Sequence, residues 1–314
     1  MYIIRFLKNW TLPVAIVSGI IGYLVYSHLP WLDATRPYAA PTVAVVQPIL
    51  ISFMLFLSFC KIDIRQLRPR LTHLWLLLIQ CGLFALLGLL LHFWPDMPGG
   101  ILVEGAALCV ICPTATAAAV VTQKLQGDAA DVTMYTILSN VAVAIIVPLV
   151  VPLVHPHAGQ TFMVSFALIL SNVFPMLIFP LVVAQTVRWF LPPLHRFFTS
   201  FRDLAFYLWA VSLSIAIAVT TRSIAHSHEP LGELAALAAV SFACCVFQFG
   251  VGRIIGRHYG RPVCTAQGLG QKNTVFGIWM GYTFLNPVTS IAGGFYSIWH
   301  NCYNTYQMRR MGRS

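Results

Sequence analysis

Charged side chains are scarce in this chain of 314 residues, because only 9% of its residues are Asp, Glu, Lys or Arg. Soluble domains carry about 25%. Hydrophobic residues make up 58% of the chain, so the composition excludes an ordinary soluble protein and indicates one that uses lipid as its solvent. The apolar runs are continuous rather than alternating, which predicts an all-α bundle and not a β-barrel.

Sequence motifs of intramembrane enzymes are missing as well. The chain has no His-Glu-x-x-His zinc motif and no Gly-x-Ser-x-Gly nucleophile elbow. Cys109-x-x-Cys112 has metal-ligand spacing but no second pair, and cysteines in apolar helices usually pack. The run from His226 to Glu229 falls in a predicted outer loop, where histidines are usually incidental. We therefore expect no enzyme, no metal site, no cofactor and no disulfide framework.

Apolar stretches of about 20 residues suffice to cross a hydrocarbon core of ~30 Å as helices. The sequence contains ten such stretches, near 10–29, 41–59, 71–94, 101–123, 132–154, 162–187, 204–221, 231–252, 264–284 and 287–306. They predict a single transmembrane domain over 1–314, with connections near 30–40, 60–70 and 188–203. An even number of spans places both termini on the same side.

Positive charge is distributed unequally between the two sides of these spans. One side receives Arg5, Lys8, Lys61, Arg65, Arg68, Arg70, Lys124, Arg188, Arg196, Arg202, Arg253, Arg257, Arg261, Arg309, Arg310 and Arg313, and the other receives Arg36 and Arg222. The positive-inside rule explains the net charge of +10 better than a nucleic-acid surface does. We therefore predict cytoplasmic termini in a multi-pass protein of the bacterial inner membrane, with lipid and not nucleic acid around it.

Two of the spans carry polar interruptions at equivalent places in two sets of five. Pro113 interrupts span four and lacks a backbone donor, while Gly268 and Gly270 are predicted to loosen span nine. Unwound backbone persists at membrane depth only where it is buried in protein or lines a cavity. The pattern predicts an inverted repeat, 1–160 and 161–314, whose broken helices cross near the midplane.

The half-helices that resume after these interruptions would present free N–H groups and a positive dipole end, which suit an anionic ligand. Thr114 and Thr116 are predicted to cap one of them, and Asn273 and Thr274 the other.

Lys272 lies inside the second interruption, whereas every other lysine or arginine can be placed in a loop or tail. An amine near the bilayer centre costs roughly 2.5–3.5 kcal/mol on insertion scales. Lys272 is therefore a functional-site candidate.

Three motifs in order resemble those of one known family. They are Cys112-Pro113-Thr114-Ala115-Thr116, Gly270-Gln271-Lys272-Asn273-Thr274 and Ser297-Ile298-Trp299-His300-Asn301. Together they resemble the bile acid:sodium symporter family over essentially the whole chain. The resemblance implies a panel domain (spans one, two, six and seven), a core domain holding the rest, and alternating-access transport of bile-acid-like anions or smaller carboxylates, mostly with two sodium ions. It maps substrate contacts onto Thr116 and Asn273, with Thr114 and Thr274 beside them, and gives weaker roles to Trp299 and Asn301.

The sodium ligands that the resemblance implies are mostly replaced. Their positions fall on Ala118, Ala119, Gly268, Lys272 and Val132, none of which offers a side-chain oxygen. Gln80 and Thr136 keep oxygen donors. A lysine 4 Å from a bound cation would repel it by about 4 kcal/mol at an effective dielectric constant of 20. We therefore expect the usual sodium coupling to be absent.

Lys272 is predicted to substitute for a cation, held by Gln80 and by backbone carbonyls of the broken helices. Loss and regain of a proton in each cycle is a second possibility, and a structural lysine that only neutralises helix carbonyls is the alternative. Glu104 is the nearest candidate counter-charge, and Asp131 reads as a helix N-terminal charge. A transport-inactive membrane sensor or binding protein is the alternative function. Substrate identity and oligomeric state stay open.

Overall fold

The computed structural model describes residues 11–155, 160–201, 203–227 and 229–311. Within these ranges the secondary structure is helical and contains no strand. The long helices are α2 (Thr11–His28), α3 (Arg36–Cys60), α4 (Leu71–Phe93), α7 (Ala129–Val154), α8 (Phe162–Phe190), α10 (Leu204–Ala225), α11 (Leu231–His258) and α14 (Ser290–Met311). The shorter ones are η1 (Pro30–Thr35), η2 (Ile64–Gln66), α5 (Gly100–Ile111), α6 (Ala117–Lys124), α9 (Pro192–Ser200), α12 (Pro262–Gly270) and α13 (Thr274–Phe284).

Seven helices in the described residues are long and apolar enough to cross a membrane, and α5 is a shorter apolar helix. The predicted polytopic helical bundle is thus confirmed, while the count of ten spans stays a prediction. Spans four and nine each consist of two half-helices, α5 with α6 and α12 with α13, as the interruptions predict.

The predicted connections contain short helices, with η1 in the stretch near 30–40 and η2 in the one near 60–70. The stretch near 188–203 was expected to be a loop, but α9 occupies residues 192–200. Pro192 and Pro193 begin this helix, where the missing N–H of proline leaves no helical hydrogen bond unmade.

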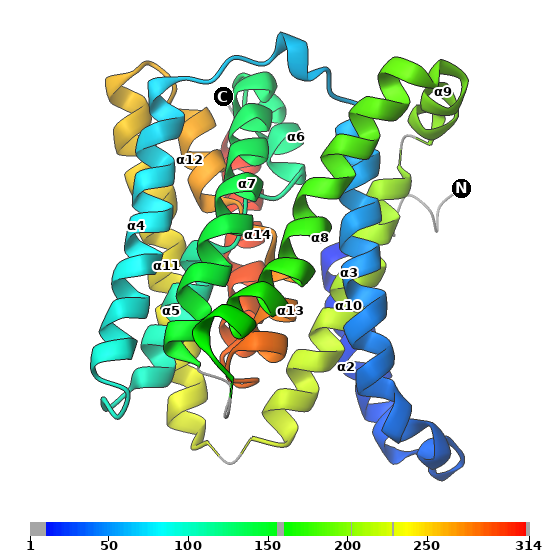
Figure 1. The fold of residues 1–314 in the computed structure, drawn as a ribbon, viewed down its shortest axis with the longest axis vertical. Helices are drawn as coiled ribbons and strands as arrows, with labels where there is room; N and C mark the ends of the chain where they lie inside the picture. The colour runs from blue at the N-terminus through cyan, green and yellow to red at the C-terminus, as the bar shows by residue number, and fades with distance from the viewer. Residues whose placement is uncertain (1–10, 156–159, 202, 228, 312–314) are drawn as a thin grey trace.

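The helices gather in two groups. Figure 1 shows α2, α3 and α10 at one side of the bundle, with α8 leaning against them, and α4, α5, α11 and α12 at the other side. Helices α7, α13 and α14 lie between. Buried apolar residues of α3, α5, α7, α8, α10 and α13 form one continuous core that connects the two groups.

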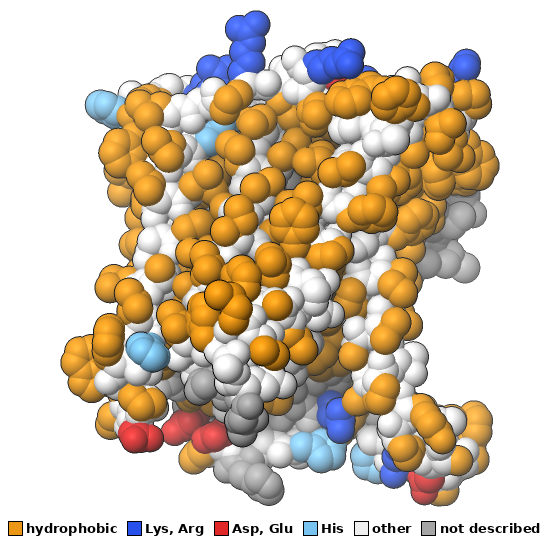
Figure 2. Space-filling model, in the orientation of Figure 1, with side chains coloured by type: hydrophobic (Ala, Val, Ile, Leu, Met, Phe, Trp, Pro, Cys, Tyr) orange, Lys and Arg blue, Asp and Glu red, His pale blue; other side chains and the backbone are white. Residues whose placement is uncertain are grey.

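Basic side chains collect at the end of the bundle where α9 lies, which we call the basic end. It includes Lys61, Arg65, Arg68, Arg70, Lys124, Arg188, Arg196, Arg253, Arg257, Arg261, Arg309 and Arg310, at the ends of helices that terminate there. Figure 2 shows Lys and Arg side chains gathered at this end, and Asp and Glu side chains together with some Lys, Arg and His side chains at the other. The predicted basic residues Arg5, Lys8, Arg202 and Arg313 lie outside the described residues.

Helix α12 packs unusually close to α11. A Cβ atom added at Gly252 would lie 2.5 Å from the carbonyl oxygen of Thr265 and 2.9 Å from the Cα atom of Ala266. At Gly250, half a turn away, it would meet nothing within 4 Å. Gly252 therefore allows the backbones of α11 and α12 to touch, which holds the first half of the second broken helix against the bundle.

Candidate functional site

The two helix interruptions meet as a short antiparallel bridge between Thr114 and Lys272. The Ala115 N–H donates to the carbonyl oxygen of Gln271 at 2.9 Å, and the Asn273 N–H donates to that of Pro113 at 2.7 Å. Each unwound segment thus satisfies the backbone of the other, as buried irregular backbone requires. We call residues 112–116 together with 271–273 the crossing.

The last four carbonyls of α5 end at the crossing, where no further helical turn can bond them. The Leu108 carbonyl accepts from the Cys112 N–H. The carbonyls of Cys109, Val110 and Ile111 accept from side chains of Gln248, Lys272 and Gln80, at 3.3, 2.9 and 3.0 Å. Side chains from α11, the crossing and α4 therefore complete the end of this half-helix.

Lys272 is buried, with 1% of its surface exposed. Its Nζ donates to the carbonyl oxygen of Val110 at 2.9 Å. The C-terminal end of a helix carries a partial negative charge, which favours a cation. Among the described residues no carboxylate forms an ion pair with Lys272, so the end of α5 takes the place of a counter-ion.

Gln80 makes no hydrogen bond to Lys272, so the prediction that Gln80 holds the amine is wrong. Its Nε2 donates to the carbonyls of Ile111 and Cys112, both at 3.0 Å. Its Oε1 accepts from the Tyr135 hydroxyl at 2.7 Å. Lys272 and Gln80 therefore donate to different carbonyls at the end of α5.

Thr116 and Asn273 stand at the starts of the resumed half-helices. The Asn273 Oδ1 accepts from the Phe276 N–H at 3.3 Å and caps α13, as predicted. Its Nδ2 makes no hydrogen bond to a described residue. Thr116 precedes α6 without forming a side-chain cap, contrary to prediction. Both side chains therefore keep donors that a ligand can use.

Thr114 and Thr274 have different environments. Thr114 is fully buried, and its hydroxyl donates to the carbonyl oxygen of Gly268 at 2.7 Å, so the prediction that it caps a half-helix is wrong. Thr274 is the first residue of α13 and is buried, and Asn273, not Thr274, forms the cap. Thr114 thus joins the two broken helices directly.

Gly270 ends α12, but the helix continues through Gly268, so Gly268 does not mark the interruption. A Cβ atom at Gly268 would lie 3.0 Å from the ring of Tyr135. At Gly270 it would lie 2.4 Å from the ring of Phe249. The two glycines make room for aromatic rings rather than loosening the backbone.

Thr136 uses its side-chain oxygen within its own helix. Its hydroxyl donates to the carbonyl oxygen of Val132 at 2.9 Å, and its carbonyl accepts from Ser139 and Asn140. Ser139 Oγ also contacts the Thr114 hydroxyl at 3.3 Å. A polar network therefore runs from α7 into the crossing.

His300 is a polar residue that the sequence motifs did not single out as a site residue. It is 5% exposed, and its Nδ1 is buried without a partner in the described residues. The neighbouring Trp299 donates to the carbonyl of Ala238 and to Ser241, and Asn301 donates to the Ser297 carbonyl of its own helix. A buried imidazole nitrogen without a partner is the signal that distinguishes His300 from these packing residues.

Glu104 is occupied away from Lys272. One carboxylate oxygen accepts from the Asn286 N–H and the Thr289 hydroxyl, both at 2.8 Å. The other lies 2.9 Å from His155 Nε2. Glu104 therefore joins α5 to the start of α14.

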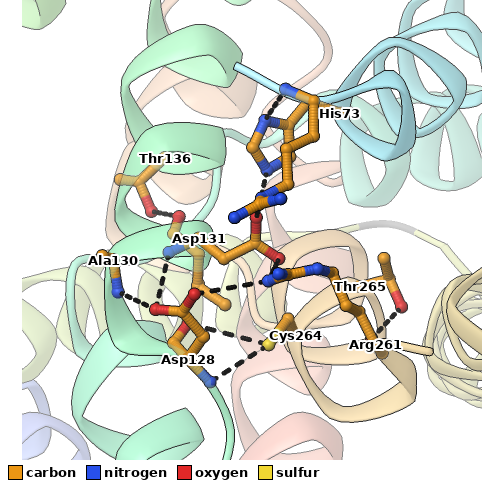
Figure 3. Close-up of polar contacts among 10 residues, drawn as sticks. His73, Asp128, Ala130, Asp131, Thr136, Arg261, Cys264 and Thr265 are labelled. Atoms are coloured by element: carbon orange, nitrogen blue, oxygen red, sulfur yellow. Dashed lines mark hydrogen bonds and ion pairs between the residues drawn. The ribbon is translucent and has the colours of Figure 1, made fainter. Parts of the chain in front are cut away.

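An ion cluster around the buried carboxylate of Asp131 lies at the basic end of the bundle (Figure 3). One oxygen of Asp131 lies 3.0 Å from Arg70 Nε and 3.1 Å from His73 Nε2, and the other lies 3.3 Å from Arg261 Nη1. Because His73 Nδ1 accepts from the Arg70 N–H, its proton resides on Nε2, facing Asp131. Arg261 also pairs with Asp128 at 3.3 Å. Asp131 was predicted only as a charge at the N-terminal end of a helix. In the structure it also forms ion pairs that join α4, α7 and the segment before α12.

Among the residues that the structure describes, no group of three or more His, Cys, Asp or Glu side chains is arranged so that it could hold a metal ion. His226 contacts Tyr23 and the carbonyl of Arg222. His228, part of the outer-loop run, lies outside the described residues.

Comparison with models of known protein families gives a match. A family model described as the sodium bile acid symporter family matches residues 48–227. The matched residues include the first interruption and end before the second. A search of curated proteins found no matching sequence.

Proposed function

This chain belongs to the sodium bile acid symporter family, and we propose that it carries an organic anion across the membrane by alternating access, with Lys272 in place of a coupling cation. The anion is bile-acid-like or a smaller carboxylate. The proposed topology has ten spans, with inverted repeats 1–160 and 161–314 and both termini in the cytoplasm of a bacterium. Helices α2, α3, α8 and α10 would form the panel domain, and the remaining spans the core domain. The two groups of helices in Figure 1 support this division.

The crossing carries the proposal. Two half-helices, α6 and α13, begin there, and their N-terminal N–H groups and dipoles favour negative charge. Thr116 and Asn273 stand at these two starts with unused donors. A carboxylate placed between them would accept hydrogen bonds from both halves of the molecule, so its binding would depend on how the halves are arranged.

The atoms around the crossing argue against a bound sodium ion. A sodium ion needs several oxygen acceptors, yet the carbonyls of Val110, Ile111 and Cys112 already accept from the Lys272 amine and the Gln80 amide. A cation 4 Å from a charged amine would lose about 4 kcal/mol at an effective dielectric constant of 20. This arrangement supports the view that the Lys272 amine, which is tethered to the chain, occupies the place of a bound cation and binds a carbonyl oxygen at the end of α5.

Uptake into reconstituted vesicles tests the proposal. Several organic anions would be offered while sodium and pH gradients are varied separately. We expect uptake that does not respond to a sodium gradient and that Lys272→Gln abolishes or slows severely, whereas Lys124→Gln at the exposed end of α6 leaves it unchanged. Uptake that rises steeply with a sodium gradient at constant pH contradicts the tethered-amine mechanism.

The pH arm separates a permanently charged amine from one that exchanges a proton in each cycle, because only the second makes uptake depend on the proton gradient. Thr116→Ala and Asn273→Ala should each weaken substrate binding. Binding of an anion without counterflow across the membrane would favour the alternative of a transport-inactive sensor.

A further inference from the structure

Helix α9 lies outside the bundle proper, and one of its faces has no protein partner among the described residues. The inner face packs on α3: the ring of Phe198 lies 4.9 Å from that of Phe56, and His195 Nε2 lies 2.8 Å from the carbonyl oxygen of Cys60. The outward side chains include Leu194 and Phe197, which are 40% and 56% exposed. Exposed phenylalanine and leucine at the end of a helical bundle require a covering surface.

The outward part of α9 divides into two flanks. Successive residues of a helix are rotated by about 100°. Leu194 therefore falls within about 60° of Phe197 on an apolar flank, which Phe201 continues just after the helix. Arg196 lies about 160° from Leu194 and shares a polar flank with Ser200, which lies about 120° from Leu194 and borders Phe197. The packed residues His195 and Phe198 lie between Leu194 and Arg196 on the other side of the helix. This three-way division is that of a helix lying at a membrane surface, with one face on protein, one in lipid and one in water.

The preceding helix places α9 at the right level. Helix α8 has 29 residues, which corresponds to about 43 Å and exceeds a hydrocarbon core of ~30 Å. Its last turn contains Arg188 and Trp189, residue types that mark a membrane interface. Helix α9 begins two residues after α8 ends, at the level where a headgroup layer is expected.

Positive charge surrounds this layer. The Arg65 guanidinium carbon lies 4.6 Å from the centre of the Trp189 ring, which holds the arginine beside the apolar surface. Arg188 pairs with Asp63 at 3.2 Å, and Arg196 has no acidic partner among the described residues. All of these belong to the basic end, so the covering surface must tolerate or supply negative charge.

We propose that α9 is a lipid-binding helix whose apolar flank (Leu194, Phe197 and Phe201) inserts among acyl chains while Arg196 and Arg65 bind the phosphates of anionic phospholipids. The complementary charge favours anionic headgroups over a second protein surface, which would have to bring its own carboxylates. The proposal depends on membrane embedding and not on the transported substrate.

Site-directed fluorescence on the full chain in lipid nanodiscs tests the insertion. An environment-sensitive probe would be placed at Leu194→Cys or Ser200→Cys, about 120° apart on the helix, in a Cys302→Ser background, since Cys302 is the exposed native cysteine among the described residues. The probe at 194 should be quenched by lipids carrying a quencher on the acyl chain and protected from aqueous iodide, and the probe at 200 should show the reverse. Equal iodide quenching at both positions overturns the proposal, as does protection at 194 without lipid quenching, which indicates a protein partner.

Headgroup preference is measured with the same probe at 194. Quenching by labelled phosphatidylglycerol is compared with quenching by labelled phosphatidylcholine. Each basic residue near an anionic surface is worth about fivefold in binding, so Arg196→Gln should reduce the preference for phosphatidylglycerol by about that factor. Arg196→Lys should retain it, and Arg222→Gln at the opposite end should leave it unchanged. An unchanged preference in Arg196→Gln overturns the phosphate contact.

Discussion

The amine of Lys272 lies 2.9 Å from the carbonyl oxygen of Val110, so the interruption of the second broken helix closes the end of the first half-helix. The two residues are 162 positions apart in the chain. An amine from one half of the molecule thus meets the negative end of a helix dipole from the other half. Any conformational change that moves the two halves of the molecule apart at the crossing must also separate Lys272 from Val110.

Lys272→Met separates a functional role from a structural one. The substitution leaves the Val110 carbonyl without a donor, which costs about 1–3 kcal/mol. It also removes the desolvation penalty of a buried amine, which is several kcal/mol. We therefore expect the free energy of unfolding, measured with denaturant in detergent, to stay level or rise while vesicle uptake is lost. A large fall in stability would make Lys272 a structural tether.

Gln80→Leu should destabilise the protein by about 2–4 kcal/mol, because it leaves the carbonyls of Ile111 and Cys112 and the Tyr135 hydroxyl unpaired in a buried site. Tyr135→Phe is the matched control. It removes only one of these hydrogen bonds and should cost about 1 kcal/mol. Thermal unfolding of both variants checks the order, and equal losses would argue against a shared role of Gln80 at the two carbonyls.

Asp131→Asn should cost more than Asp128→Asn. The Asp131 side chain is 2% exposed and neutralises Arg70 and Arg261, whereas the Asp128 side chain is 45% exposed. Removing one partner of a fully buried ion pair costs about 3–5 kcal/mol, and an exposed pair is worth about 0–1 kcal/mol. Because the side chains of Arg70 and Arg261 are 42% and 27% exposed, the cost of Asp131→Asn should fall between these two limits. Urea unfolding in detergent measures the difference. Similar effects of the two variants would mean that water screens Asp131.

Gly252→Ala should disturb the contact between α11 and α12, because its new methyl group would overlap the backbone at Thr265 and Ala266. Overpacking of this kind costs about 1–3 kcal/mol. Gly250→Ala enters open space and should be neutral or slightly stabilising, since alanine favours helix. The thermal unfolding midpoints of the two variants provide the measurement, and a tolerated Gly252→Ala would show that the two helices can move apart.

The hydrophobic pattern predicted most of the helix positions. For example, the span expected near 71–94 is α4 over Leu71–Phe93, and the one near 204–221 is α10 over Leu204–Ala225. Long apolar runs are a strong signal because lipid leaves the backbone no other way to satisfy its hydrogen bonds. Helix α9 was not predicted, because it is short and begins with two prolines, which are typical of a loop.

The site was predicted less completely than the helices. Pro113 and Lys272 indicated where the helices break, and Asn273 was recognised as a cap. Gly268 was misplaced because a glycine can either interrupt a helix or admit a neighbouring ring, and only the position of Tyr135 distinguishes the two. Gln80 was recognised as part of the site, but its partners were not.

The composition, the long apolar runs and the positions of the charged and helix-breaking residues thus determined that the chain is a helical membrane protein with two interrupted spans and an unusual buried lysine. These are local properties, since each depends on a few neighbouring residues and on the solvent around them. The tertiary structure decided which side chain donates to which carbonyl: Lys272 donates to that of Val110, and Gln80 donates to that of Ile111. Such pairings join distant segments, and they are set by the packing of whole helices against one another.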